Sequence, residues 1–148
     1  MRPHSIEPLD IDYAPVLAML HAESFGAERW SEDQIRGSLS LETTRGWLAK
    51  TGGGPAGFLL CQTVVGETEI LTLCVKPSLR RLGIGIGLLR SLLNDTPRGH
   101  VIHLEVASDN KAARSLYEKC GFSAVGVRPG YCRRGQKQIE AIRYRLML

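Results

Sequence analysis

The sequence has 148 residues, a length typical of one domain around one hydrophobic core. Hydrophobic residues make up 43% and charged residues 23%, which is an ordinary composition for a soluble globular protein. No apolar run approaches the roughly 20 residues of a membrane-spanning helix, and the first residues do not form a signal peptide. We therefore expect a single cytoplasmic domain over residues 1–148, with no membrane contact.

The formal net charge of +4 is unevenly distributed along the chain. Residues 1–76 carry six Lys and Arg against ten Asp and Glu, whereas residues 77–148 carry thirteen against five. A basic half suits a ligand with several phosphates, and an acidic half suits a basic substrate. A chance distribution is an equally good explanation.

The cysteines and histidines do not predict a metal site. The four cysteines include no C-x-x-C pair and are typical of reduced thiols that pack as small core residues. His100 and His103 lie three apart in a predicted strand, so their side chains point to opposite faces.

The first half of the chain predicts an edge strand over residues 4–9 and an amphipathic helix from residue 12 to about 23. Ser31-x-x-Gln34 matches a capping box, so a short helix is expected to begin at Ser31, with Trp30 packing on Ile35. Strands are expected over residues 47–50 and 56–65, joined by a glycine-rich turn at 52–55, and again over 70–75.

Residues 80–87, Arg-Arg-Leu-Gly-Ile-Gly-Ile-Gly, lie between this last strand and a helical pattern. Gly83 and Gly85 lack a Cβ, so backbone amides there can approach a ligand closely at a helix N-terminus, which attracts phosphate. Arg80 and Arg81 add positive charge. The segment predicts a pyrophosphate-binding loop; the alternative is an ordinary strand-to-helix turn with two solvated arginines.

Two common phosphate loops do not fit this segment. A Walker loop ends in Gly-Lys-Ser/Thr, whereas Gly87 is followed by two leucines. A dinucleotide fingerprint needs G-x-G-x-x-G, and the third glycine here comes one residue too early.

The second half predicts a strand over residues 101–107, a helix capped by Asp109 or Asn110, and two final strands over 122–127 and 139–148. Gly121 stands where a left-handed residue would end that helix. The order of elements predicts one mixed α+β domain.

Two segments resemble the GCN5-related N-acetyltransferases (GNAT). Arg80, Gly83 and Gly85 match the [Q/R]-x-x-G-x-[G/A] pattern of their acetyl-CoA loop, and residues 104–122 look like their L-E-V-x-x-x-N-x-x-A-x-x-L-Y-x-x-x-G-F segment. More narrowly, this segment, Trp30-Ser31-Glu32 and Gly130-Tyr131 resemble the RimI type, the ribosomal-protein-alanine acetyltransferases. The resemblance covers residues 5–148.

The resemblance implies the GNAT fold, a twisted mixed sheet that splays between two parallel strands and is flanked by about four helices. It implies acetyl-CoA as co-substrate, no metal, and the N-terminal alanine of a small-subunit ribosomal protein as acceptor. The residues implied to contact the cofactor are Leu73, Val75, Arg80, Arg81, Gly83, Ile84, Gly85, Gly87 and Asn110.

The resemblance further implies Glu105 as general base and Tyr117 as general acid. An α-amine has a reference pKa of about 7.7–8.0, so a modest base suffices, and a phenol with a pKa near 10 can protonate a departing thiolate. Alternatively, Glu105 is a solvated or salt-bridged strand residue paired with His103, and Tyr117 a core aromatic. Asn110 can both cap its helix and contact the cofactor.

Trp30 and Tyr131 are the implied substrate contacts, and the chain departs from the subfamily near the second of them. Cys132 follows Tyr131 where the subfamily has a second tyrosine, and Glu140 stands where aspartate is common. The acceptor could therefore be another protein N-terminus, a lysine or a small amine.

A third possibility is a non-catalytic acyl-CoA-binding module that associates with ribosomes or RNA. The basic residues lack interleaved aromatics, so no direct nucleic-acid binding is expected. We expect a monomer or weak dimer.

Overall fold

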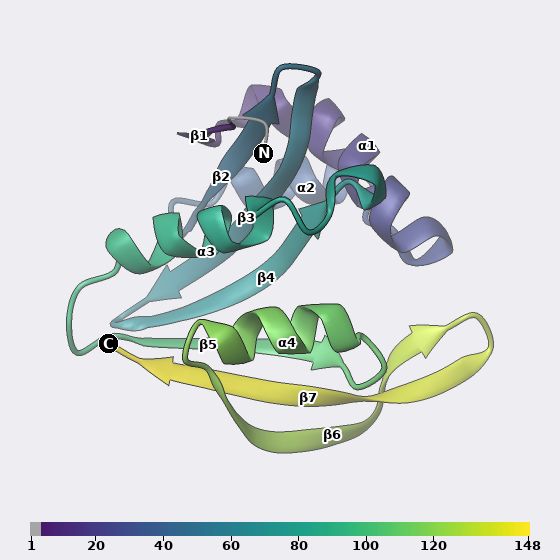
Figure 1. The fold of residues 1–148 in the computed structure, drawn as a ribbon, viewed down its shortest axis with the longest axis vertical. Coiled ribbons are helices and arrows are strands. Elements are labelled where there is room, and N and C mark those ends of the chain that lie inside the picture. The colour runs from purple at the N-terminus through teal and green to yellow at the C-terminus, as the bar shows by residue number, and fades with distance from the viewer. Residues whose placement is uncertain (1–3) are drawn as a thin grey trace.

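The computed structural model describes residues 4–148, which form one seven-stranded sheet flanked by helices (Figure 1). The strands are β1 Ser5–Pro8, β2 Thr44–Thr51, β3 Gly54–Val64, β4 Glu67–Val75, β5 Val101–Ala107, β6 Ser123–Arg134 and β7 Lys137–Met147. The α-helices are α1 Ala14–Phe25, α2 Glu32–Leu39, α3 Ile84–Asn94 and α4 Lys111–Lys119. Short 3-10 helices are η1 Ile11–Tyr13, η2 Gly26–Glu28 and η3 Pro77–Leu79.

The strand order is β1-β2-β3-β4-β5-β7-β6, and within residues 4–148 only β4 and β5 pair in parallel. Their pairing covers Glu67–Glu69 against Val101–His103 and then stops. Beyond these residues the two strands diverge, as Figure 1 shows. The splayed sheet and the mixed fold predicted above are confirmed.

A β-bulge in β4 determines which side chains point to each face of the sheet. Leu71 has no partner in β3, so the alternation of β4 shifts by one residue at this point. Leu73 and Val75 therefore pack against the core beneath α3, and Cys74 joins the core beneath α1. If Leu71 paired regularly with β3, these side chains would lie on the opposite faces.

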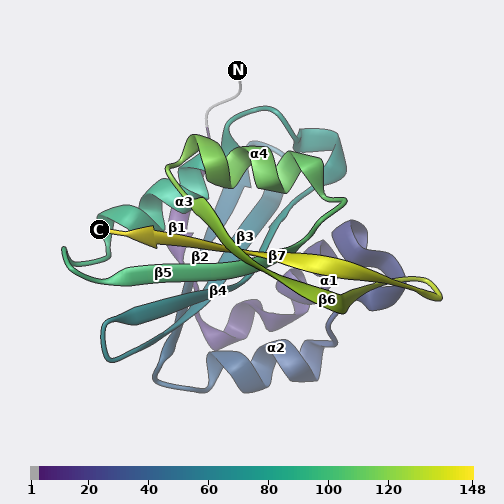
Figure 2. The same cartoon turned by 90° about the horizontal axis from the view of Figure 1, so that it is seen from below.

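The helices cover both faces of the sheet, with α3 and α4 on one face and α1 and α2 on the other (Figure 2). Each face has its own hydrophobic core. The α3 and α4 residues that fill the first are Ile84, Leu88, Leu89, Leu92 and Tyr117. The α1 and α2 residues that fill the second are Ala14, Leu17, Leu20 and Ile35.

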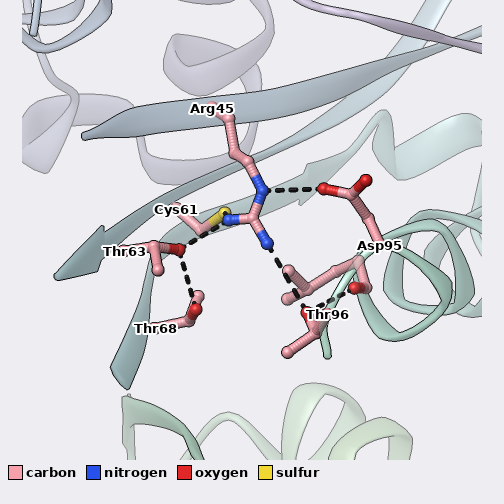
Figure 3. Close-up of polar contacts among 7 residues, drawn as sticks. Arg45, Cys61, Thr63, Thr68, Asp95 and Thr96 are labelled. Atoms are coloured by element: carbon pink, nitrogen blue, oxygen red, sulfur yellow. Dashed lines mark hydrogen bonds and ion pairs between the residues drawn. The ribbon is translucent and has the colours of Figure 1, made fainter. Parts of the chain in front are cut away.

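Arg45, near the start of β2, joins the end of α3 to the sheet through a polar network (Figure 3). Its Nε lies 2.9 Å from Asp95 Oδ2, just after α3, and its Nη1 donates to Thr63 Oγ1 at 2.6 Å. Thr63 in turn contacts Thr68 Oγ1 at 2.8 Å, inside the segment where β4 and β5 still pair. A guanidinium beside a helix C-terminus is also favourable to the helix dipole. The network therefore fixes α3 where the sheet is closed.

The predicted helix ends are confirmed. Ser31 Oγ accepts the N–H of Gln34 at 3.1 Å, and Gln34 Oε1 accepts the N–H of Ser31 at 2.8 Å, which completes the capping box. Asn110 Oδ1 accepts the N–H of Ala113 at 3.2 Å, so Asn110 is the cap of α4. Gly121 follows α4 with a φ of +94°.

The strand β6 is longer than predicted. Pro129 and Gly130 are turn-forming residues, and the pattern predicted a strand only to residue 127. The strand continues to Arg134 because a register shift between Arg128 and Cys132 accommodates the irregular residues while pairing with β7 resumes.

None of the helices between residues 4 and 148 combines the length and the apolar character that a membrane span requires.

The Arg45 network predicts a stability difference between two arginines. Arg45→Met should lower the free energy of unfolding by about 2 kcal/mol, because the half-buried Thr63 hydroxyl loses a charged donor and the exposed Asp95 loses an ion-pair partner. Arg36→Met is the control, since its pair with Glu32 is exposed and worth ~0.5 kcal/mol or less. Urea denaturation measures both; an equal effect of the two substitutions would contradict a structural role for the network.

Candidate active site

The start of α3 presents unpaired backbone amides beside a left-handed turn. Gly83 precedes the helix with a φ of +82°, and Arg81 has a φ of +67°, which is uncommon for a residue with a Cβ. Among residues 4–148, the amides of Ile84, Gly85 and Ile86 have no hydrogen-bond acceptor. Unpaired amides at a helix N-terminus attract an anion. The geometry suits an anion such as phosphate, and the binding of one stays a prediction.

The two later glycines of the loop are needed for packing. A Cβ on Gly85 would lie 3.1 Å from Leu116 Cδ2, so this glycine lets α3 approach α4 closely. A Cβ on Gly87 would lie 3.0 Å from Ile6 Cδ1, against β1. The amide of Gly87 already donates to Gly83 O at 3.0 Å. The amide of Gly87 is therefore already paired, and the contact of Gly87 with a cofactor stays a prediction.

The diverging edge of β4 leads from the sheet to this loop. From Ile70 to Val75, β4 has no partner strand on the β5 side within the described chain. The carbonyl of Val75 accepts hydrogen bonds from Arg80 Nε at 3.3 Å and from Ser24 Oγ at 3.5 Å. Both arginines of the loop are exposed. The backbone of Leu73 and Val75 thus lies on an unpaired edge that ends at the loop.

Tyr117 of α4 is a core residue with 5% of its surface exposed. Its ring packs edge-on against Phe122, with centroids 5.7 Å apart, and is tilted against Tyr144 at 6.2 Å. Burial raises the pKa of Tyr117 well above its ordinary value, with smaller contributions from the neighbouring Cys74 and Cys120 thiols. Tyr117 packs in the core beneath α3 and α4, which also contacts Leu73 and Val75 of the unpaired stretch of β4.

Glu105 lies on β5, two residues beyond the last pairing with β4. Its side chain is 14% exposed, and its Oε1 lies 2.9 Å from Arg128 Nη2 and 3.6 Å from Arg143 Nη1. Its Oε2 is buried without a hydrogen-bond partner among residues 4–148. Glu105 is thus a salt-bridged strand residue, as the alternative interpretation predicted, but its partners are the two arginines. The predicted pairing with His103 is wrong, because His103 Nε2 lies 3.2 Å from Glu67 Oε1.

Tyr131 of β6 and Glu105 of β5 both contact the guanidinium of Arg128. Arg128 Cζ is 4.1 Å from the centre of the Tyr131 ring, and Tyr131 is 55% exposed. On the other side, Arg143 Nη1 lies 3.4 Å from Glu69 Oε1. Neither arginine was predicted from the sequence, since only the pairing of β5, β7 and β6 brings Arg143 and Arg128 to Glu105.

Trp30 belongs to a different group of side chains, at the junction of α1 and α2. Its backbone N–H donates to His21 Nδ1 at 3.0 Å, and its ring stacks on the His21 imidazole at 4.8 Å. Burial lowers the pKa of His21 to about 4, which keeps the ring neutral. The junction does contact the β6–β7 hairpin, where Glu28 Oε1 accepts the N–H of Gly135 at 3.1 Å. A substrate contact of Trp30 stays a prediction.

Within residues 4–148, no three His, Cys, Asp or Glu side chains are grouped so that they could hold a metal ion.

A surface cavity of about 350 Å³ lies beside the charged residues of β4, β5 and β7, lined in part by Gln62, Glu67, Glu69, His103 and Arg143. Carboxylates and an imidazole at its wall suit a cationic or hydrogen-bonding group.

Sequence comparison finds related acetyltransferases over most of the chain. The profile of the acetyltransferase (GNAT) family matches residues 12–122. The N-alpha-acetyltransferase RimI of Mycobacterium tuberculosis is 38% identical over 121 residues, which cover 78% of this chain and 76% of the relative. The [Ribosomal protein bS18]-alanine N-acetyltransferase of Escherichia coli is 28% identical over 130 residues, 86% of this chain and 84% of that protein.

Solved structures have the same fold. The crystal structure of the ribosomal-protein-S18-alanine N-acetyltransferase from Escherichia coli superposes with a TM-score of 0.89 at 27% identity, covering 97% of this chain and 93% of the other. Arabidopsis thaliana NAA60 in complex with acetyl-CoA superposes with a TM-score of 0.85 at 16% identity, covering 99% of both chains. The second likeness is one of fold alone.

Proposed function

The chain belongs to the GNAT family and is an acetyl-CoA-dependent N-acetyltransferase, and from this premise we propose that it acetylates the N-terminal alanine of a small-subunit ribosomal protein. The observation that carries the proposal is the similarity, in sequence and in fold, to the Escherichia coli enzyme over most of both chains. The excess of acidic residues in the first half of the chain is consistent with a basic protein substrate. Such a substrate places the reaction in the cytoplasm.

We assign the pyrophosphate of acetyl-CoA to the loop before α3. The unpaired amides of Ile84, Gly85 and Ile86 supply donors, and Arg80 and Arg81 supply positive charge next to them. The pantetheine arm would then follow the unpaired edge of β4, where the backbone of Leu73 and Val75 can bind it as an additional strand would. Asn110 would contact the cofactor while it caps α4.

In the proposed reaction, Glu105 takes a proton from the acceptor ammonium through a water molecule. The α-amine is acidic enough, with a reference pKa of about 7.7–8.0, for a carboxylate held at short range to deprotonate it. The free amine then attacks the acetyl carbon, and an N–C bond forms as the C–S bond breaks. The location of Glu105 just beyond the last β4–β5 pair supports this role.

Tyr117 would give its proton to the departing CoA sulfur. Because burial raises its pKa, the phenol carries its proton at every physiological pH and is available as an acid. The nitrogen of the new amide loses its second proton to solvent, Tyr117 regains a proton from solvent, and Glu105 releases to solvent the proton that it took. The products are the acetylated N-terminus and CoA thiol.

We predict that Glu105→Gln and Tyr117→Phe each lower kcat by ~100-fold or more while acetyl-CoA still binds, the range for general acid–base groups. Glu67→Gln and Tyr13→Phe are matched controls, because the exposed Glu67 pairs with His103 and Tyr13 contacts Glu7. Steady-state kinetics and calorimetric titration with acetyl-CoA measure the two quantities. Wild-type turnover in both site variants would refute the assigned roles.

We predict that Gly83→Val raises the Kd for acetyl-CoA by about tenfold or more, a loss of ~1.4 kcal/mol, because a branched side chain blocks the approach of phosphate to the amides. Gly99→Val is the control, since Gly99 has a similar φ of +89° and open space around its Cβ position. Both variants carry the same backbone strain. Similar affinities in the two variants would count against this loop as the phosphate site.

The experiment that tests the proposed function is intact-mass spectrometry of small-subunit ribosomal proteins after incubation with the enzyme and acetyl-CoA. We expect one added acetyl group on one protein, located by fragmentation at an N-terminal alanine. Tyr117→Phe, at equal concentration and time, controls for chemical acetylation. Acetyl groups on lysines, or none while acetyl-CoA binds, would overturn the proposed acceptor.

A further inference from the structure

Glu105 has two arginine partners that are held in different ways. Arg143 stands directly opposite Glu105 in the β5–β7 pair, and it also contacts Glu69. Arg128 comes from β6, one strand further away, and its Nη2 reaches Glu105 Oε1 at 2.9 Å. Arg128 is 52% exposed, against 34% for Arg143. Arg143 is thus a fixed neighbour of the carboxylate, and Arg128 covers it from the solvent side.

The backbone beneath Arg128 is irregular. Arg128 pairs with Ala141, and the register of β6 shifts before pairing resumes at Cys132. The guanidinium of Arg128 forms an ion pair with Glu105 and lies over the Tyr131 ring. Both contacts are with a partly exposed guanidinium, so each is individually weak. Arg128 can therefore leave Glu105 without disturbing the sheet.

The guanidinium of Arg128 contacts Glu105 Oε1, which is the oxygen that a cationic acceptor would approach. A protonated amine and Arg128 cannot both contact Oε1 closely without repulsion between like charges. The other oxygen, Oε2, is buried and unpaired, and so is less accessible. Binding of the acceptor amine, directly or through water, thus requires Arg128 to move.

We propose that Arg128 is a gate over Glu105, a positioning residue that covers the carboxylate until the acceptor amine displaces it. The inference rests on the proposed function, because it takes Glu105 as the base. While closed, the gate keeps water from being activated by Glu105. Activated water would attack the acetyl carbon, the C–S bond would break, and acetate and CoA thiol would form without an acceptor.

The test is Arg128→Met, which keeps much of the apolar stem but removes the charge. Without acceptor, acetyl-CoA hydrolysis, followed as acetate release, should rise about fivefold, the factor that corresponds to an ion pair worth ~1 kcal/mol. The KM for an acceptor peptide should fall by a similar factor because the amine no longer competes with Arg128. The kcat of transfer should stay within about twofold, and Arg128→Lys should give intermediate values.

Arg134→Met is the matched control, since Arg134 is another exposed arginine of β6 and pairs with Asp109 at 3.2 Å. It should change neither hydrolysis nor the KM. A raised KM in Arg128→Met would show that Arg128 binds the acceptor and would overturn the gate, as would unchanged hydrolysis. If the wild-type enzyme acetylates no peptide, the proposed acceptor is wrong, while the hydrolysis comparison still tests the gate.

Discussion

The short parallel pairing between β4 and β5 is the constraint on which the rest of the structure depends. Three residue pairs hold the strands together, and the sheet then opens. Arg45 fixes the end of α3 at the closed side through Asp95 and Thr63. The start of α3, which carries the unpaired amides, follows the strand end where β4 has left β5. The same sheet thus supports α3 at its closed side and presents a free strand edge to a ligand at its open side.

The two faces of the opened sheet supply different chemistry. The core beneath α3 and α4 contains Tyr117, whose burial keeps the phenol protonated. Glu105 alternates with Leu104 and Val106, which point into that core, so its carboxylate lies on the opposite face among arginines. Because the sheet separates the Tyr117 phenol from the Glu105 carboxylate, no proton passes directly from one to the other. They can act on the same thioester only where the strands no longer pair.

Much of this arrangement follows from local sequence. The capping box at Ser31, the Asn110 cap and the glycine loop depend on residues that are neighbours in the chain, and each was predicted correctly as a structural element. The partners of Glu105 were not predicted, because Arg128 and Arg143 reach it only through strand register. The extension of β6 was missed for a related reason, since pairing with β7 overrides its turn-forming residues. The roles assigned to Glu105 and Tyr117 remain predictions.

The extra residue in β4 also places a bend where the sheet opens. Leu71 stands out of register with β3, two residues after Glu69, the last residue of β4 that pairs with β5. A β-bulge bends its strand and increases the local twist, so β4 changes direction where it leaves β5. Deleting Leu71 would restore regular pairing with β3 and would leave Leu73 and Cys74 with their present partners and on their present faces. The deletion would therefore keep both cores in register and remove only the bend beside the opening of the sheet.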